Sequence, residues 1–261
     1  MTDPLALHDD PFVNRRDKPR LVVFSGAGLS AESGIPTFRD KEGLWENHKI
    51  DEVCEITTFE KNYRLVHKFY NDRRVQLGTV HPNIAHQTIA HWQKKYGEDR
   101  VSVITANVDD LLERGGCTKV THVHGKITEM VMRRGEPSEF VQDIGYKKFD
   151  ADHWLNHEVK AKPNVVFFGE CTRYDNEHKK VNIYDHMLDV FRSLTVEDTV
   201  IVIGTSEVVV PVWYYLAGKP CHTVWINPSE SKNHYMTSFI GTACTQILNV
   251  DEYLVKRRMD D

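Results

Sequence analysis

Short apolar runs, separated by longer stretches with helical periodicity, dominate the hydrophobic pattern of this chain. The runs that we interpret as candidate buried strands are Leu21–Phe24, Val101–Thr105, Val165–Phe168, Thr199–Gly204 and Thr223–Asn227. Continuous apolar runs of this length predict strands that are buried on both faces. Strands that alternate with helices are typical of a parallel sheet with helices on both sides. The pattern therefore predicts an α/β fold with a Rossmann-like, doubly wound parallel sheet.

Two segments fit this sheet poorly, and we expect them to form a smaller inserted lobe. They are a helical stretch at about residues 44–97 and a charged, irregular insert at about 126–162. The Rossmann part is expected in three pieces, at about residues 18–43, 98–125 and 163–261. Together these pieces make a single domain over residues 18–261, preceded by a polar lead-in over residues 1–17.

The segment after the first strand carries the strongest chemical signal. Residues 25–39 read S-G-A-G-L-S-A-E-S-G-I-P-T-F-R. Gly26 and Gly28 can adopt positive φ angles and carry no side chain, so the turn exposes backbone amides to a phosphate. A dehydrogenase turn should open a long helix, but Gly34 and Pro36 interrupt the segment within two turns. This favours a nucleotide site with chemistry on the ribose side.

Polar residues follow three of the predicted strands and should meet in one crevice at the carboxyl edge of the sheet. The tips are Ser25-Gly26, Thr105-Ala106-Asn107 and Gly204-Thr205-Ser206. Asp109 begins a predicted helix, where a carboxylate is most often only a cap. His122 and His124 alternate with Val123 and so share one face. A histidine at a strand end beside a nucleotide has the pKa range of a general base. Asn107, Asp109 and His124 therefore form a candidate catalytic constellation.

Charge, cysteine spacing and hydropathy indicate which kinds of partner and compartment to expect. The net charge of −5 and the isoelectric point near 6.3 offer no broad basic surface, so nucleic acid is not an expected partner. The five cysteines are widely spaced and odd in number, which argues against a disulfide framework and for a reducing compartment. The chain has neither an apolar stretch long enough to span a membrane nor a signal peptide at its start. We expect a cytoplasmic protein with no membrane partner.

The ordered motifs make the chain resemble a sirtuin, the family of NAD-dependent protein-lysine deacylases. The family's phosphate turn is matched by residues 26–39, its T-Q-N-x-D motif by T-A-N-V-D, and its catalytic H-G by His124-Gly125. The segment K-P-N-V-V-F-F-G-E matches its substrate staple, and G-T-S matches its ribose contact. The resemblance implies NAD as cofactor and acylated lysine side chains of proteins as substrates.

The resemblance also implies roles for individual residues. His124, Asn107 and Asp109 would be catalytic, and the remaining cofactor contacts would be Gly26, Ala27, Gly28, Ser30, Ile35, Phe38, Arg39, Gly204, Thr205, Ser206 and Asn227. The acyl-lysine would run past Val166 and Phe168, with its backbone paired to Gly169-Glu170 as an added strand. Products would be nicotinamide, free lysine and O-acyl-ADP-ribose.

The helix around H-K-F-Y-N-D-R-R indicates which acyl group is preferred. The residues Tyr63, Val66, Tyr70, Arg73 and Leu77 fall on one helical stripe. An arginine on such a stripe more often snorkels or pairs with a carboxylate. Sirtuins that remove succinyl or malonyl groups resemble this chain in carrying Tyr-x-x-Arg here, followed by a P-N-x-A-H. Tyr70 and Arg73 would then bind the distal carboxylate of the acyl group.

Two departures from the family pattern lead to further expectations. The family's zinc cysteines are absent from residues 126–162, and His153 with His157 cannot complete a tetrahedral structural site, so no zinc is expected. Ala106 stands where the family has glutamine. The alanine lacks the glutamine's neutral hydrogen bond near the ribose, a loss of roughly 1 kcal/mol. An NAD glycohydrolase or ADP-ribosyltransferase using the same site is therefore an alternative. A catalytically quiet module that binds NAD or ADP-ribose is a third possibility.

Overall fold

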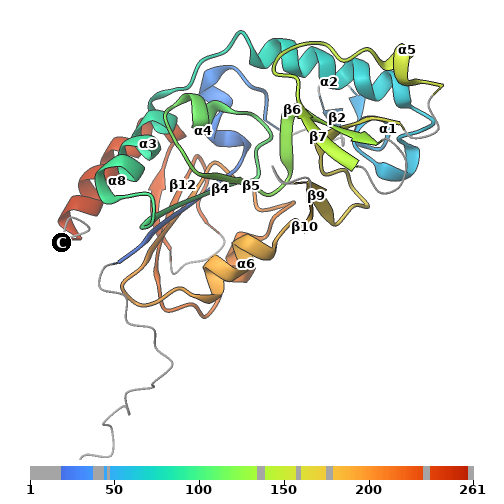
Figure 1. Ribbon diagram of the computed structural model, residues 1–261. Helices are drawn as coiled ribbons and strands as arrows, with labels where there is room; N and C mark the ends of the chain where they lie inside the picture. Colours follow the sequence, from blue (N-terminus) through green and yellow to red (C-terminus); the bar gives the residue numbers. More distant parts are fainter. Residues whose placement is uncertain are drawn as a thin grey trace, which may run out of the picture.

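The computed structural model describes residues 19–37, 44–45, 48–133, 139–156, 160–174, 179–231 and 236–257. Its largest element is a parallel sheet of six strands in the order β13-β12-β11-β1-β4-β5 (Figure 1). The strands are β1 (Leu21–Ser25), β4 (Val101–Thr105), β5 (Val120–His122), β11 (Thr199–Ile203), β12 (His222–Asn227) and β13 (Thr237–Ile240). The predicted Rossmann-like sheet is confirmed, with β5 and β13 as edge strands.

The central strands β1 and β11 are buried along their whole length, with helices on both faces of the sheet. Alternate residues of β1 enter opposite cores, so that Leu21 and Val23 pack on one side while Val22 and Phe24 pack on the other. The first core includes α3 (Ile84–Tyr96) and α8 (Ala243–Lys256), and the second includes α6 (Asp185–Arg192) and α7 (Val212–Leu216). The carboxyl edge of the sheet thereby stays open to polar side chains.

A smaller lobe lies beside the sheet (Figure 1). It contains an antiparallel sheet in the order β7-β6-β8, formed by β7 (Glu139–Asp143), β6 (Gly125–Arg133) and β8 (Lys162–Val165). Its helices are α1 (Ile50–Val53), α2 (Tyr63–Leu77) and α5 (Ala151–Trp154), and α2 packs on β6 and β8. Helix α3, which the sequence assigned to this lobe, packs on the parallel sheet, because Ala85, Ile89 and Trp92 are buried there.

The predicted strand Val165–Phe168 differs most from the structure. Only Val165 belongs to a strand, β8, which pairs antiparallel with β6 in the smaller lobe and places Val165 opposite Gly125. Val165 and Phe167 are buried in the core that includes α2 rather than in the parallel sheet. Periodicity reports burial but not the sheet to which a strand belongs, and this explains the error.

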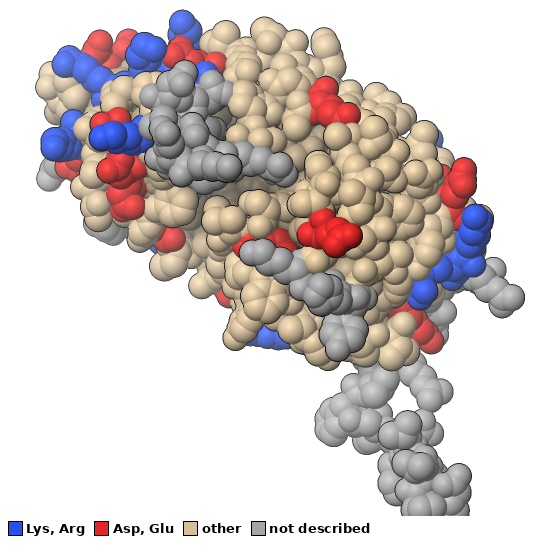
Figure 2. All heavy atoms as spheres, turned by 180° about the vertical axis from the view of Figure 1, so that it is seen from behind, with Lys and Arg blue, Asp and Glu red and all other residues tan. Residues whose placement is uncertain are grey.

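Short elements complete the chain. They are the pair β2 (Leu44–Trp45) and β3 (His48–Lys49), the pair β9 (Thr172–Tyr174) and β10 (Lys180–Asn182), helix α4 (Leu111–Arg114), and the 3-10 turns η1 (Ala27–Leu29), η2 (Ala31–Ser33) and η3 (Ile56–Thr58). All five cysteines are free thiols, as their spacing predicted. No helix within the described ranges has the length and apolar character needed to cross a membrane. On the face shown in Figure 2, basic and acidic side chains are interspersed at one end.

Candidate active site

The glycine turn after β1 is packed directly against the tip of β11. Gly26 and Gly28 donate their amide hydrogens to the carbonyl oxygens of Ile203 and Gly204, at 3.0 and 2.7 Å. A Cβ atom on Gly28 would lie 2.7 Å from the Cα atom of Gly204. Gly26 has a φ angle of −121°, and neither turn glycine adopts the positive φ that the sequence suggested. Close backbone packing, and not a left-handed conformation, is what requires glycine here.

Ser30, at the end of η1, joins three parts of the chain through its hydroxyl group. Its Oγ donates to Oδ2 of Asp109 at 2.9 Å and accepts from Nδ2 of Asn107 at 3.2 Å. The Nε2 atom of His86 lies 3.3 Å from the same oxygen. All four side chains are buried. The hydroxyl group therefore fixes Asn107 and Asp109 relative to the glycine turn.

The direction of the His86 contact follows from its other ring nitrogen. The amide of Asn83 donates to Nδ1 of His86 at 3.2 Å, so the proton of the neutral ring is on Nε2 and is donated to Ser30. Burial lowers the pKa of His86 to about 4, which keeps the ring neutral. The sequence reasoning missed His86 as a site residue. The sequence feature that could have located His86 is a capping box: Asn83 caps α3, and the side chain three residues later, His86, accepts from the Asn83 amide.

Asp109 is both a cap and a site residue. Its Oδ1 accepts from the amide of Leu111 at the start of α4, at 3.1 Å, while its Oδ2 accepts from Ser30. Burial raises the pKa of the Asp109 carboxyl, and the two hydrogen bonds oppose this effect. A contact with the start of α4 and a functional role of Asp109 are therefore compatible, because Oδ1 accepts from Leu111 and Oδ2 accepts from Ser30.

The two histidines of the β5 edge are held by consecutive main-chain carbonyls. Nδ1 of His124 lies 3.1 Å from the carbonyl oxygen of Ala106, and Nδ1 of His122 lies 2.9 Å from that of Asn107. His122 also contacts Glu113 through Nε2, at 2.9 Å, so both of its ring nitrogens are engaged. A carbonyl only accepts, so His124 carries its proton on Nδ1. Its Nε2 is then left with a lone pair for accepting a proton.

The ribose-side tip of β11 and the end of β12 meet at Asn227. Gly204 has a φ angle of +64°, and a Cβ atom there would lie 2.4 Å from the amide nitrogen of Leu29. Asn227 is buried and donates through Nδ2 to the carbonyl oxygen of Thr205. Its Oδ1 is also buried and has no hydrogen-bond donor within the described part of the chain. A ribose hydroxyl is a donor of the kind that would satisfy this oxygen.

The predicted substrate strip shows the alternation expected of it. Val165 and Phe167 are buried in the smaller lobe, whereas Val166 is half-buried and Phe168 is 41% exposed. The amide of Val166 donates to the carbonyl oxygen of His124 at 2.9 Å, which places this strip directly beside the candidate base. Gly169 adopts a φ angle of +83° and turns the chain toward Glu170.

On helix α2, the two adjacent arginines have different environments. Arg74 is fully buried, and its guanidinium donates to the carbonyl oxygen of Ile127 and to Oδ1 of Asn71, both at 2.6 Å. Arg73 is half-buried, with its guanidinium carbon 5.4 Å from the ring centre of Phe69. The arginine that enters the core is therefore Arg74, which the predicted stripe did not include.

Tyr70, one turn before Arg73, is also fully buried. Its hydroxyl donates to Sγ of Cys54 at 3.5 Å, and its ring stacks on Phe167 with centroids 5.6 Å apart. Phe167 precedes Phe168 of the substrate strip, so Tyr70 lies behind the strip rather than on the surface. Burial raises the pKa of Tyr70, which therefore stays a protonated hydrogen-bond donor at neutral pH.

Some predicted residues are placed elsewhere or lie outside the described residues. Ile35 is half-buried against the core of the smaller lobe, and its amide donates to the carbonyl oxygen of Ser30 at 3.3 Å. Phe38, Arg39 and His157 lie outside the described residues. His153 is exposed, with its ring edge toward Trp154.

The smaller lobe has a partly buried polar contact between α2 and the loop before α5. The described ranges contain no cluster of three or more histidine, cysteine or acidic side chains placed to bind a metal ion. Asn71 accepts from Arg74 and from the amide of Phe149, and donates to the Phe149 carbonyl at 2.9 Å. This partly buried polar contact ties α2 to the loop before α5.

We expect the purified protein to contain substoichiometric zinc and to keep its melting temperature in a strong chelator. Structural zinc couples to folding, so a zinc-dependent lobe would unfold as the metal left. Elemental analysis and thermal unfolding with and without chelator test this expectation. One tightly bound zinc per chain, or a large loss of stability in the chelator, would contradict it.

Comparisons with known proteins agree with this geometry. The model of the Sir2 family matches residues 26–211. An NAD-dependent protein deacylase of Helicobacter hepaticus is 42% identical over 214 residues, covering 76% of this chain and 79% of the relative. The Escherichia coli K12 protein with the same name is 34% identical over 248 residues, covering 92% and 84%.

Solved structures lead to the same family. A mutant of a Sir2 homologue in complex with ADP-ribose aligns with a TM-score of 0.73 and 28% identity, covering 92% of this chain and 93% of the homologue. A Sir2 homologue in complex with NAD aligns with a TM-score of 0.72 at the same identity, covering 92% and 91%.

Proposed function

Because this chain belongs to the Sir2 family, we propose that it is an NAD-dependent protein-lysine deacylase that prefers succinyl and malonyl groups and also removes acetyl. The observation that supports this best is the network around Ser30. It joins the glycine turn to Asn107 and Asp109, and the residue before Asn107, Ala106, holds the ring of His124 through its carbonyl oxygen. In this proposal a phosphate site, two fixed polar groups and a base would share one edge of the sheet.

The residues present fit NAD. The turn from Gly26 to Ser30 would lie against the pyrophosphate, with Ile35, Asn107 and Asp109 around the nicotinamide. The amides of Gly26 and Gly28 are donated to main-chain carbonyls and are not the exposed donors that the sequence suggested. Thr205, Ser206 and Asn227 would hold the ribose end, where the buried Oδ1 of Asn227 needs a donor. When bound, NAD would supply an electrophilic anomeric carbon for the acyl oxygen of the substrate. With one water molecule consumed, the products would be nicotinamide, free lysine and O-acyl-ADP-ribose. Phe38 and Arg39 remain predicted contacts.

Residues of the chain supply the base and hold it in the correct tautomer. The Ala106 carbonyl fixes the Nδ1 proton of His124, so that Nε2 accepts a proton from a ribose hydroxyl. Burial lowers the pKa of His124 below 6.5, despite the opposing hydrogen bond to Ala106. The imidazole is therefore neutral, and active as a base, at neutral pH.

The lowered pKa of His124 predicts the acid limb of the pH profile. A base acts in its neutral form, and the neutral fraction falls as the pH drops through the pKa. The acid limb of kcat/KM for deacylation should therefore be centred below the ordinary pKa of histidine, roughly 6.5. Rates measured from pH 5 to 8 at saturating NAD test this. An acid limb centred above the ordinary histidine pKa would contradict the neutral, half-buried base.

The acidic-acyl preference rests on Tyr70 and Arg73. Tyr70 lies behind the strip formed by Val166 and Phe168, and Arg73 follows one turn later on α2 with its guanidinium half-buried. An acyl chain that passed the strip would bring its distal carboxylate toward this end of α2. There the tyrosine hydroxyl and the arginine would both donate to it.

The deciding experiment incubates the protein with NAD and a succinyl, malonyl or acetyl peptide, or with no peptide, and follows nicotinamide and the fate of the acyl group. Peptide-dependent nicotinamide release with acyl transfer to ADP-ribose supports the deacylase. Nicotinamide release without peptide would favour a glycohydrolase or ADP-ribosyltransferase. Binding of NAD without turnover would favour a quiet module. A cytoplasmic location, and the lack of nucleic-acid and membrane partners, remain predictions.

A further inference from the structure

The chain between Glu170 and α6 forms a hairpin that the site described above does not use. Strands β9 and β10 pair antiparallel, with Arg173 opposite Val181 and Tyr174 opposite Lys180. Tyr174 is buried, and its carbonyl oxygen accepts from Nδ2 of Asn164, on β8, at 3.3 Å. The hairpin is thus docked on the strand that leads into the substrate strip.

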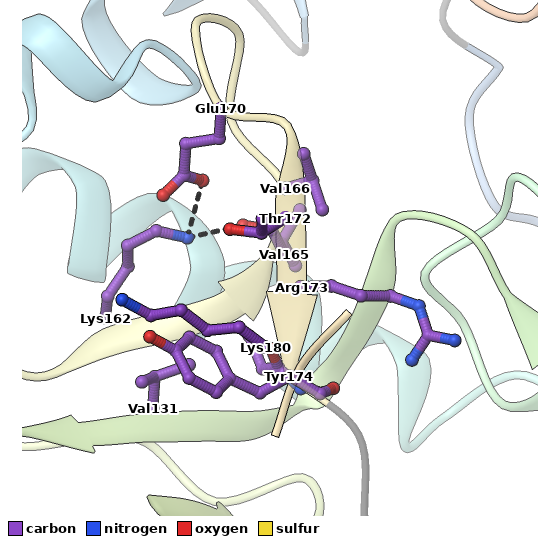
Figure 3. A pocket seen from close by; sticks show the side chains of 10 residues that line it. Val131, Lys162, Val165, Val166, Glu170, Thr172, Arg173, Tyr174 and Lys180 are labelled. Atoms are coloured by element: carbon purple, nitrogen blue, oxygen red, sulfur yellow. Dashed lines mark hydrogen bonds and ion pairs between the residues drawn. The ribbon is translucent and has the colours of Figure 1, made fainter. Parts of the chain in front are cut away.

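A small pocket lies between this hairpin and β8 (Figure 3). Its volume is about 70 Å³, and its lining includes Val166, Glu170, Arg173 and Lys180. A cavity of roughly 15 Å³ holds one water molecule, so the pocket accommodates a few non-hydrogen atoms and not a nucleotide. Lys162 also lines it, so the pocket has three cationic side chains and one carboxylate.

The single carboxylate in the lining is already engaged. Glu170 accepts from Nζ of Lys162 at 3.1 Å and from the amide of Phe167 at 2.7 Å. Lys162 is buried, and it also donates to main-chain carbonyls of its own strand. This pair fixes the loop that follows the substrate strip. The other two charged side chains of the lining, Arg173 and Lys180, belong to the hairpin.

Figure 3 separates the remaining two cations. Lys180 extends to the side of Lys162 and Glu170, whereas Arg173 extends to the opposite side, on which Val166 lies. Val166 is the residue of the strip whose amide bonds to the His124 carbonyl oxygen. Arg173 is therefore the cation of the hairpin that faces the path of the substrate.

We propose that Arg173 determines substrate specificity by binding an acidic side chain next to the acyl-lysine of the target protein. The inference rests on the proposed deacylase function, and it concerns the sequence around the lysine rather than the acyl group. Substrate backbone paired to Gly169-Glu170 would carry its neighbouring side chains past β9, which begins two residues later. A guanidinium binds a carboxylate bidentately, which favours Asp or Glu over the neutral amides.

The test compares acetyl-lysine peptides that differ only in having Asp or Asn at each of the positions flanking the lysine. Acetyl carries no charge, so Tyr70 and Arg73 do not contribute to the difference. We expect the wild-type protein to favour Asp at one or more positions by about five- to tenfold in kcat/KM, mainly through KM. The substitution Arg173→Gln should remove this preference and leave the Asn peptides unchanged.

Lys180→Gln is the matched control, because it removes the same charge from the other side of the same hairpin. It should retain the preference for Asp, and Arg173→Lys should retain part of it. If Lys180→Gln loses the preference for Asp peptides as fully as Arg173→Gln does, the preference comes from general electrostatic attraction and the proposal is overturned. Equal losses on Asp and Asn peptides in Arg173→Gln would make Arg173 a structural residue and also overturn it.

Two further outcomes keep this inference separate from the proposed function. Deacylation by the wild-type protein without any preference at the flanking positions overturns the role of Arg173 and leaves the deacylase intact. A lack of deacylation with every acyl peptide overturns the proposed function itself. If Arg173→Gln has a lowered melting temperature, the comparison of Arg173→Lys with Lys180→Gln decides the question.

Discussion

Replacing His124 by alanine is expected to lower the deacylation rate by about 10²–10⁴-fold, the usual contribution of a general base. Binding of ADP-ribose should change little, because the residues proposed to hold the nucleotide, in the Ser30 network and at Asn227, have no hydrogen bond to His124 in the described structure. Single-turnover rates and calorimetric titration with ADP-ribose measure the two quantities. A rate close to that of the wild-type protein would exclude His124 as the base.

His122 provides the control for this variant. It is a second histidine two residues away, but its Nδ1 and Nε2 atoms are engaged by Asn107 and Glu113. His122→Gln is therefore expected to lower the melting temperature while retaining most of the deacylation rate in the folded fraction. If His122→Gln loses as much rate as His124→Ala without losing stability, His122 and not His124 is the base.

Replacing Arg73 by methionine is expected to reduce kcat/KM for succinyl-lysine by about one to two decades. The reason is that the substitution removes a charge-assisted hydrogen bond that contributes roughly 1.5–3 kcal/mol. Turnover of acetyl-lysine should be unchanged or improved, because acetyl carries no carboxylate. Tyr70→Phe should show a weaker form of the same selectivity. The measurement is the ratio of kcat/KM for succinyl and acetyl forms of one peptide.

The neighbouring arginine separates recognition from folding. Arg74→Met leaves the Ile127 carbonyl and the Asn71 side chain without their buried donor, at a cost of about 1–3 kcal/mol. It should therefore lower the melting temperature without changing the preference for succinyl over acetyl. If Arg73→Met instead reduced both activities equally, Arg73 would be a second structural arginine, and the acidic-acyl assignment would be withdrawn.

The sequence located the parallel sheet and the tips of its strands because both depend on local patterns. An apolar run such as Leu21–Phe24 predicts a buried strand, and the polar residues after it lie at the carboxyl edge by geometry alone. The tips at Ser25-Gly26 and Asn107 were expected in one crevice for this reason. Ser30 was named only through the family resemblance, and the structure brings its hydroxyl group within hydrogen-bonding distance of Asn107 and Asp109.

Other features depend on contacts that no local pattern encodes. The backbone of Gly28 packs against Gly204, which is far away in sequence, so the need for glycine there was attributed to the wrong cause. The contact of His86 with Ser30 joins α3 to the turn after β1. The choice between Arg73 and Arg74 as the buried arginine depends on the position of Ile127 in β6, because helical periodicity does not separate neighbouring residues that finely.

The ring of His124 is hydrogen-bonded to a main-chain carbonyl rather than to a side chain, and this has a consequence for substitutions at position 106. The ring is oriented by the carbonyl oxygen of residue 106, and every amino acid has that carbonyl, whatever its side chain. A lineage can therefore exchange the side chain at this position and keep the tautomer of its base. Ala106 can therefore change the contacts around the nucleotide without changing which nitrogen of His124 carries the proton.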